Sequence, residues 1–169
     1  MFQDLTKVSA ITAAGMVGVV SFGNALGRVF WAWLSDIVTR RMTFVIMYLL
    51  QVALFWVLPS LHTVGVVTVV SFIILMCYGG GFGTMPAFTA DYFGAKNVGP
   101  IYGLMLTAWS FASVFGPVLI ANMRQSTGVY GGALHIIAVV LLLSVVLPLI
   151  VRPPRATIGL GEPVGSGVR

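Results

Sequence analysis

The stretch SFGNALGRVFWAWLSDIVTRR, residues 21–41, decides the fold of this chain. It joins the end of a long apolar segment to a basic turn, and it contains Arg28, the one charge that lies well inside an apolar run. An arginine near the centre of a helix in lipid costs about 2.5–3.5 kcal/mol on insertion scales, so such a residue needs a specific reason. Further on, the turn carries Asp36 and the pair Arg40 and Arg41. The function depends on what the Arg28 side chain faces and on which residues Asp36, Arg40 and Arg41 contact.

The composition predicts a membrane protein. Of the 169 residues, 59% are hydrophobic and only 8% are charged, whereas a soluble domain carries about 25% charged residues. The net charge of +5 does not indicate a nucleic-acid partner, because the charges flank apolar runs and form no basic face. The single cysteine, Cys77, can form no intrachain disulfide, and we expect a small buried apolar residue there.

Five apolar segments are long enough to cross a bilayer, which needs about 20 residues each. They run over residues 9–35, 43–59, 64–88, 100–123 and 131–151. Their short connections predict antiparallel neighbours, and therefore an all-α membrane domain over residues 1–151. Residues 152–169 are rich in glycine, proline and valine without a helical period, and we expect them to form a disordered tail.

The basic residues between the segments predict the orientation in the membrane. One side carries six of them and the other side only two. The six are Arg40, Arg41, Lys96, Arg152, Arg155 and Arg169, and the two are Lys7 and Arg124. We therefore expect a multi-pass protein of the cell membrane, with its C-terminus cytoplasmic and its N-terminus outside. An external start without a signal peptide is expected if an odd number of helices precedes this chain in a longer protein.

The first segment carries two patterns. Gly23 and Gly27 form a GxxxG motif, which allows another helix to approach closely. A polar line shares one helix face and consists of Ser21, Asn24, Arg28, Trp31 and Ser35. Such a line must face protein or a water-filled cavity, and Arg28 lies about 12 Å along the axis from Asp36. Arg28 then either binds an anion in a central cavity or is a buried structural arginine, bonded to carbonyls or to a carboxylate of another helix.

The third and fourth segments add further candidates. Glycines between residues 79 and 83, followed by Pro86, are expected to weaken and bend the third helix where it lines protein or a cavity. Tyr78 either reaches a substrate or packs in the core. Trp109, near the middle of the fourth segment, faces a cavity or a neighbouring helix. Two glycines of the fourth segment, Gly99 and Gly103, are candidates for helix packing.

No arrangement of residues indicates an enzyme. Neither histidine has a serine, aspartate or cysteine at a useful spacing, and the four acidic residues lie far apart. The glycine cluster lies inside an apolar span and does not follow a strand, so it is not a nucleotide-binding loop. We therefore expect no catalytic site, no metal and no cofactor.

The basic turn resembles the loop motif of the major facilitator superfamily, Gly-x-Leu-(Ala/Ser)-Asp-(Arg/Lys)-x-Gly-(Arg/Lys)-(Arg/Lys). The matching residues are Leu34, Ser35, Asp36, Arg40 and Arg41, and the departures are Ala32, Ile37 and Thr39. The resemblance implies a cytoplasmic gate in which Asp36, Arg40 and Arg41 hold one conformation. A solvated turn that only sets the orientation is the alternative.

A second region resembles the oxalate/formate antiporter family within that superfamily. It comprises YGGGFGTMPAF (78–88), DYFG (91–94), Asn97, Gly99, Tyr102-Gly103, Thr107-Ala108-Trp109 and Gly116-Pro117. The resemblance implies that the five helices correspond to helices eight to twelve of a twelve-helix carrier. The chain would then be part of a C-terminal half-bundle, and the seven preceding helices would be its partner.

The same resemblance implies a carrier of small organic anions that works by alternating access. The family binds a carboxylate between a helix-eight arginine, which Arg28 matches, and a helix-eleven lysine. No basic residue lies between Ile101 and Arg124, so one arginine remains, which favours a monocarboxylate over oxalate. Asn24, Tyr78 and Trp109 would line that site. The alternative is a non-transporting remnant, or a half-carrier subunit that needs a separate N-terminal half.

Overall fold

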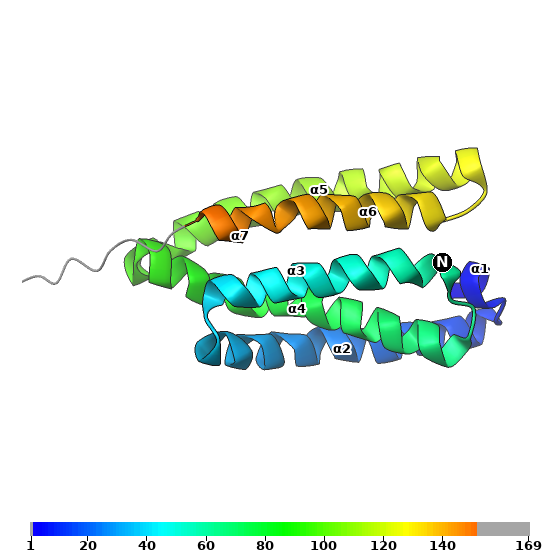
Figure 1. Cartoon of the computed structure of the whole chain (residues 1–169), viewed down its shortest axis with the longest axis horizontal. Coiled ribbons are helices and arrows are strands. Elements are labelled where there is room, and N and C mark those ends of the chain that lie inside the picture. Colours follow the sequence, from blue (N-terminus) through cyan, green and yellow to red (C-terminus); the bar gives the residue numbers. More distant parts are fainter. Residues whose placement is uncertain (1, 152–169) are drawn as a thin grey trace, which may run out of the picture.

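The computed structural model describes residues 2–151, without the side chain of Asp4, and every regular element in this range is helical. The long helices are α2 (Ala10–Ile37), α3 (Arg40–Val57), α4 (Val64–Phe93), α5 (Val98–Thr127) and α6 (Gly131–Ser144). The short ones are α1 (Phe2–Thr6), η1 (Leu58–Ser60), η2 (Ala95–Asn97) and α7 (Val146–Ile150), as Figure 1 shows. Five stretches are long and apolar enough to span a membrane, α6 and α7 together forming the fifth. The predicted all-α membrane fold is therefore confirmed, while the predicted disordered tail, residues 152–169, lies outside the described residues.

Two helix ends differ from the predicted ones, because the predictions used apolar length and not the capping residues. Helix α3 begins at Arg40 because the hydroxyl of Thr39 accepts a hydrogen bond from the backbone N–H of Met42 at 3.3 Å. Helix α4 continues past Pro86 to Phe93, and it ends where Gly94 takes a φ of +81°. A left-handed or extended positive φ is easily reached only by glycine, so the chain turns there.

Helices α2 and α4 form the closest pair, because glycines on both helices allow their backbones to approach. A Cβ at Gly23 would lie 2.8 Å from the Phe72 ring, and one at Gly27 would lie 2.7 Å from the Met76 carbonyl carbon. On the facing side, Gly79, Gly80 and Gly83 of α4 meet backbone or side-chain atoms of α2. These contacts support α4 over its glycine-rich stretch, where it runs without interruption despite the low helix propensity of glycine.

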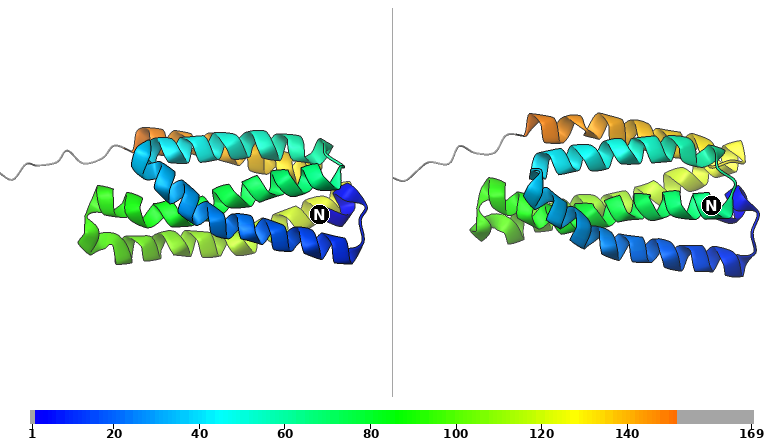
Figure 2. Two further views of the ribbon diagram at one scale, coloured as in Figure 1. Left: turned by 90° about the horizontal axis from the view of Figure 1, so that it is seen from below. Right: turned by 60° about the horizontal axis from the view of Figure 1, so that its bottom comes forward.

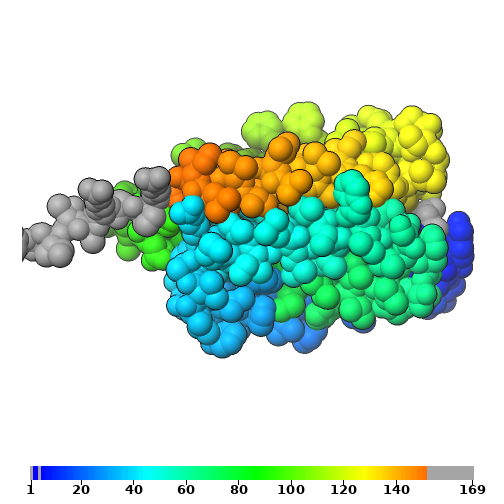
Figure 3. Space-filling model, in the orientation of Figure 1, coloured from blue at the N-terminus to red at the C-terminus, as the bar shows by residue number. Residues whose placement is uncertain are grey.

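Helix α3 lies between the α2–α4 pair and the α6–α7 segment (Figure 1). The five long helices all run along the long dimension of the molecule, with some tilt between them (Figures 1 and 2). In the space-filling view, α3 and α6–α7 form one continuous surface (Figure 3). Two clusters of buried side chains hold the bundle together. One consists of Met16, Leu58, Val67, Ile74 and Leu134, and the other of Trp31, Phe44, Met47 and Cys77.

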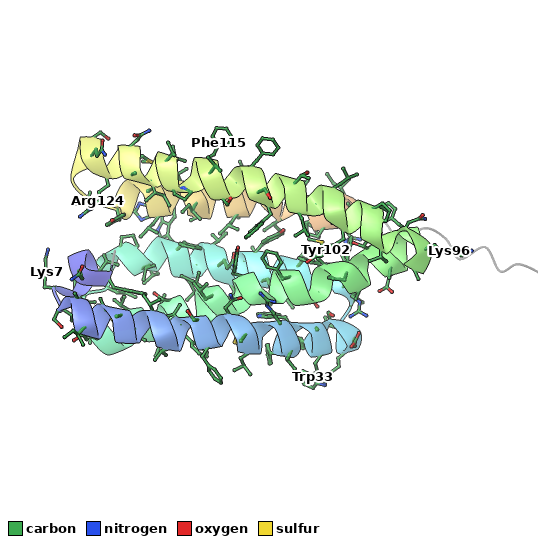
Figure 4. All side chains as sticks on the ribbon, turned by 180° about the vertical axis from the view of Figure 1, so that it is seen from behind. Lys7, Trp33, Lys96, Tyr102, Phe115 and Arg124 are labelled. Atoms are coloured by element: carbon green, nitrogen blue, oxygen red, sulfur yellow. The ribbon has the colours of Figure 1, made fainter. Side chains whose placement is uncertain are left out.

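Helix α5 contrasts with the other helices, since none of its residues is buried. Many of its apolar side chains are exposed, among them Leu104 at 71% and Phe115 at 67%, which points away from the bundle in Figure 4. A Cβ at Gly99 or Gly103 would meet no described atom within 4 Å. The two pairs of packing candidates therefore differ: Gly23 and Gly27 lie in a tight helix contact, and Gly99 and Gly103 face open space.

The two ends of the bundle carry different turns. The α2–α3 turn, the α4–α5 turn and the end of α7 lie at one end, and α1 with the remaining turns lies at the other (Figure 1). Lys96 marks the first end, and Lys7 and Arg124 lie at the second (Figure 4). The described basic residues of the predicted cytoplasmic side therefore lie at one end of the bundle, and those of the predicted external side lie at the other.

Candidate functional site

Arg28 extends from the middle of α2 towards α4. Its backbone lies against Gly83, where a Cβ would be 2.9 Å from the Arg28 Cα atom. The Arg28 Cζ atom lies 5.8 Å from the centroid of the Phe82 ring, within the range of a cation–π contact. The side chain is exposed, and no carboxylate of the described residues forms an ion pair with it. The cation is therefore held by an aromatic face and is open to an anion from outside this chain.

Phe82 connects Arg28 to two of the predicted site residues. The Phe82 ring packs edge-on against Tyr78, with 5.3 Å between centroids, and against Trp109, with 5.6 Å. The indole N–H of Trp109 donates a hydrogen bond to the Tyr78 hydroxyl at 2.6 Å. Tyr78 and Phe82 are one helical turn apart on α4, while Trp109 comes from α5. We call these three side chains the aromatic wall, and it brings Arg28, Tyr78 and Trp109 into one region.

A pocket of about 300 Å³ lies at the aromatic wall, and all three wall residues line it. Its other walls come from α3, α4, α5 and Leu141 of α6, and they carry no charged side chain. Tyr102 of α5 is one of them, and it lies in the space between α5 and the α3–α4 pair (Figure 4). A pocket of this size and composition is at the lower end of what small-molecule sites show.

Asn24 does not join this region. Its side-chain oxygen would lie 2.5 Å from a Cβ at Gly79, so it is held in the α2–α4 contact. That oxygen is buried without a hydrogen-bond partner among the described residues, and the same holds for the hydroxyl oxygen of Ser71. Both residues line a separate pocket of about 330 Å³. The predicted lining set is therefore divided by the structure into the Arg28 region and an Asn24 pocket.

The basic turn forms a network of polar contacts that joins three helices. Arg40 forms an ion pair with Asp36 at 2.5 Å and donates from its Nε to the Asp91 carboxylate at 3.0 Å. It also donates to the hydroxyl of Ser35, a residue only 2% exposed. We call these four residues the turn network. It links the end of α2, the start of α3 and the end of α4.

Arg41 extends the network to a fourth element, since its guanidinium donates to the carbonyl oxygen of Leu149 on α7. Its Nε is buried without a hydrogen-bond partner. The two neighbouring arginines therefore point to different helices, Arg40 to α4 and Arg41 to α7. The residues of the predicted gate motif lie together, and their contacts link α2, α3, α4 and α7 at this end of the bundle.

Two important residues were not among the predicted site residues. Phe82 follows Tyr78 by four residues, a spacing that places both side chains on one face of a helix. An apolar ring in an apolar span is common, however, so the spacing alone does not mark Phe82 as a site residue. Asp91 follows the third predicted segment, on the same predicted side as the basic turn, and a search for acidic partners of the turn arginines would have found it. Among the described residues, no group of three His, Cys, Asp or Glu side chains could hold a metal.

Comparison with known proteins gives the family. The sequence profile of the Major Facilitator Superfamily matches residues 1–164, and this chain belongs to that superfamily of membrane transporters. It is 26% identical over 125 residues to the apicoplast pyruvate carrier 2 of Toxoplasma gondii, a match that covers 73% of this chain and 18% of that protein. It is also 26% identical over 122 residues to the oxalate:formate antiporter of Oxalobacter formigenes, covering 69% of this chain and 29% of the antiporter.

The resemblance inferred from the two motif regions is thereby confirmed. The chain spans less than a third of the length of either of these relatives.

Proposed function

We propose that this chain is the C-terminal part of a secondary carrier for small organic anions, and that Arg28 binds the carboxylate of a monocarboxylate substrate. The observation that carries the proposal is an exposed arginine in the middle of an apolar span, without an acidic partner among the described residues. An unpaired cation in such surroundings gains most from a bidentate anion. Alternating access would then expose this site to each side of the membrane in turn.

The comparisons support the substrate class. The two relatives are named for pyruvate and for oxalate and formate, all of which carry carboxylates. Helix α5 contributes no basic side chain between Ile101 and Met123, so one guanidinium faces the site from the helices described. A single arginine neutralises one carboxylate, which favours a monocarboxylate over a dianion such as oxalate.

The conservative variant Arg28→Lys tests the role of Arg28. It keeps the charge but loses the planar fork of donors, so we expect uptake of labelled formate and lactate to fall by about tenfold or more. Arg124→Lys is the matched control. Arg124 lies near the C-terminal end of α5, away from the aromatic wall, and this variant should leave uptake unchanged. Uptake at the parental rate in Arg28→Lys would remove Arg28 from the binding site.

We assign the turn network, with Arg41, to the cytoplasmic gate. Its ion pairs join α2, α3 and α4 in the arrangement seen here, and they would have to break or re-form when the bundle rocks. We expect Asp36→Asn to slow uptake while the affinity for the carboxylate stays the same. Equal losses in rate and affinity would contradict a gating role.

A half-carrier subunit or a non-transporting remnant is the second candidate. It is favoured by α5, none of whose residues is buried within this chain. A separately encoded partner of seven helices would cover that surface. The coding region upstream of Met1 distinguishes the cases: an adjoining half-carrier gene, co-expressed with this chain, should restore uptake that the chain alone lacks.

We further propose that the chain lies in the cell membrane with the turn network on the cytoplasmic side. The bilayer would then contact the exposed apolar side chains. Cysteines introduced at Ser60 and Lys96, in a Cys77→Ser background, test the orientation with an impermeant maleimide on intact cells. Labelling at Ser60 alone is expected, and labelling at Lys96 alone would reverse the topology.

A further inference from the structure

We propose that the pocket at the aromatic wall binds the apolar tail of the substrate while Arg28 binds its carboxylate. The site then prefers monocarboxylates that carry an alkyl or aryl group of several carbons over formate and oxalate. The inference rests on the proposed function and deepens it. It concerns which carboxylates the same site selects.

The juxtaposition of the two subsites is the first observation. Phe82 belongs to both: its ring faces the Arg28 guanidinium at 5.8 Å, and it also lines the pocket. Arg28 itself does not line the pocket. Phe82 is therefore the side chain that the two subsites share, and the proposal places the first carbon atoms of the ligand against its ring.

The chemistry of the pocket is the second observation. No charged residue lines it, so a carboxylate moved into the pocket would lose its hydration without gaining a counter-charge. Two of its polar groups already bond to each other, since the Trp109 N–H donates to the Tyr78 hydroxyl. The lining suits an uncharged, apolar group, and the charged end of the ligand stays at Arg28.

The methionines among the lining residues are the third observation. Met47, Met85 and Met105 line the pocket from three different helices, α3, α4 and α5. Unbranched thioether side chains adapt to ligands of different shape. The pocket is therefore suited to several tails of similar size, as expected of a carrier for a class of acids.

Gly81 provides a direct way to fill the pocket. It lies on α4 among the lining residues, and a Cβ there would meet no described atom within 4 Å. A leucine at this position can therefore occupy pocket volume without a backbone collision. Gly65, on the same helix, also has open space around its Cβ position and does not line the pocket. Gly65→Leu is the matched control.

The experiment measures equilibrium binding of labelled hexanoate to the full chain in lipid nanodiscs, with formate, lactate, unlabelled hexanoate and hexanamide as competitors. Hexanoate should compete better than formate or lactate. Gly81→Leu should weaken hexanoate relative to lactate by about tenfold, the ratio expected when about two methylene groups are excluded from an apolar site. Gly65→Leu should leave the ratio unchanged.

A second pocket variant guards against misfolding of the first. Leu106→Phe enlarges a lining residue on α5, and it should shift the ratio in the same direction. An unchanged ratio of hexanoate to lactate in both folded variants would overturn the inference.

The competitors separate the two proposals. Direct binding of labelled formate and labelled lactate is measured alongside. Tight binding of these two with no binding of hexanoate would overturn the tail pocket and leave the proposed function standing. Hexanamide that binds as tightly as hexanoate would overturn both, because the carboxylate would then contribute nothing at Arg28.

Discussion

Arg28 and Arg40 carry the same charge and lie in opposite surroundings. Arg40 contacts two carboxylates and a hydroxyl, and its partners come from two neighbouring helices. Arg28 contacts an aromatic ring and forms no ion pair with a described residue. A cation whose charge is balanced within the chain stabilises an arrangement of helices. A cation left unbalanced in an apolar span is instead available to an anion from elsewhere, either a ligand or another segment.

The helices that surround Arg28 also differ, in how closely they pack. Helix α2 packs against α4 through glycines, so that the backbones touch, whereas α5 has no buried residue. The tight α2–α4 contact positions Arg28 relative to α4, at Phe82. The loose position of α5 leaves the Trp109 side of the aromatic wall accessible.

Breaking the α2–α4 contact should have the largest effect. Gly27→Leu would place a side chain within 2.7 Å of the Met76 carbonyl carbon, a backbone atom that cannot move without shifting α4. Overpacking of this kind costs about 1–3 kcal/mol or more, so we expect loss of the folded chain. The measurement is the yield of a single symmetrical peak in size-exclusion chromatography in detergent.

Gly18→Leu is the control for this variant, because a Cβ at Gly18 meets nothing within 4 Å on the same helix. A Gly27→Leu chain that elutes and melts like the parent would show that the close approach of α2 and α4 is not required.

Removing each arginine in turn sharpens the comparison. Arg40→Leu leaves Asp36 and Asp91 without their partner, and we expect a loss of about 1–2 kcal/mol, discounted because both carboxylates are more than half exposed. Arg28→Leu removes a charge that forms no ion pair with a described residue, so stability should stay the same or rise. Cys77, only 2% exposed, reports unfolding when a thiol-reactive dye labels it on heating. A larger loss for Arg28→Leu than for Arg40→Leu would contradict the assignment of the two arginines.

The pair of Arg40 and Asp91 should give the smallest effect. A double-mutant cycle with Arg40→Gln and Asp91→Asn should yield a coupling of about 0.5–1 kcal/mol, since the Asp91 side chain is 53% exposed. The coupling should fall at high salt because exposed charges are screened. Strictly additive losses at low salt would mean that the contact contributes nothing to holding α3 against α4.

Much of the fold was predictable because lipid imposes simple rules. Apolar length sets the spans, and the short connections between them predict antiparallel neighbours, so that alternate turns lie at the same end. The candidate site was only partly predictable. Arg28, Tyr78 and Trp109 stood out as unusual residues in apolar spans, and they do lie in one region. Phe82, which brings them together, is an ordinary apolar residue in the sequence, and its role depends on the contact of α2, α4 and α5.

The sequence by itself determined that this is a helical membrane protein of a transporter superfamily, because composition, periodicity and the turn motif are local properties. Only the tertiary structure decided which charges are balanced, since that depends on residues more than fifty positions apart, as in the contact of Arg40 with Asp91. It likewise moved Asn24 away from the aromatic wall, because the glycine contact with α4 determines how α2 is rotated. Pairing between helices is set by packing, and packing is not a local property of the chain.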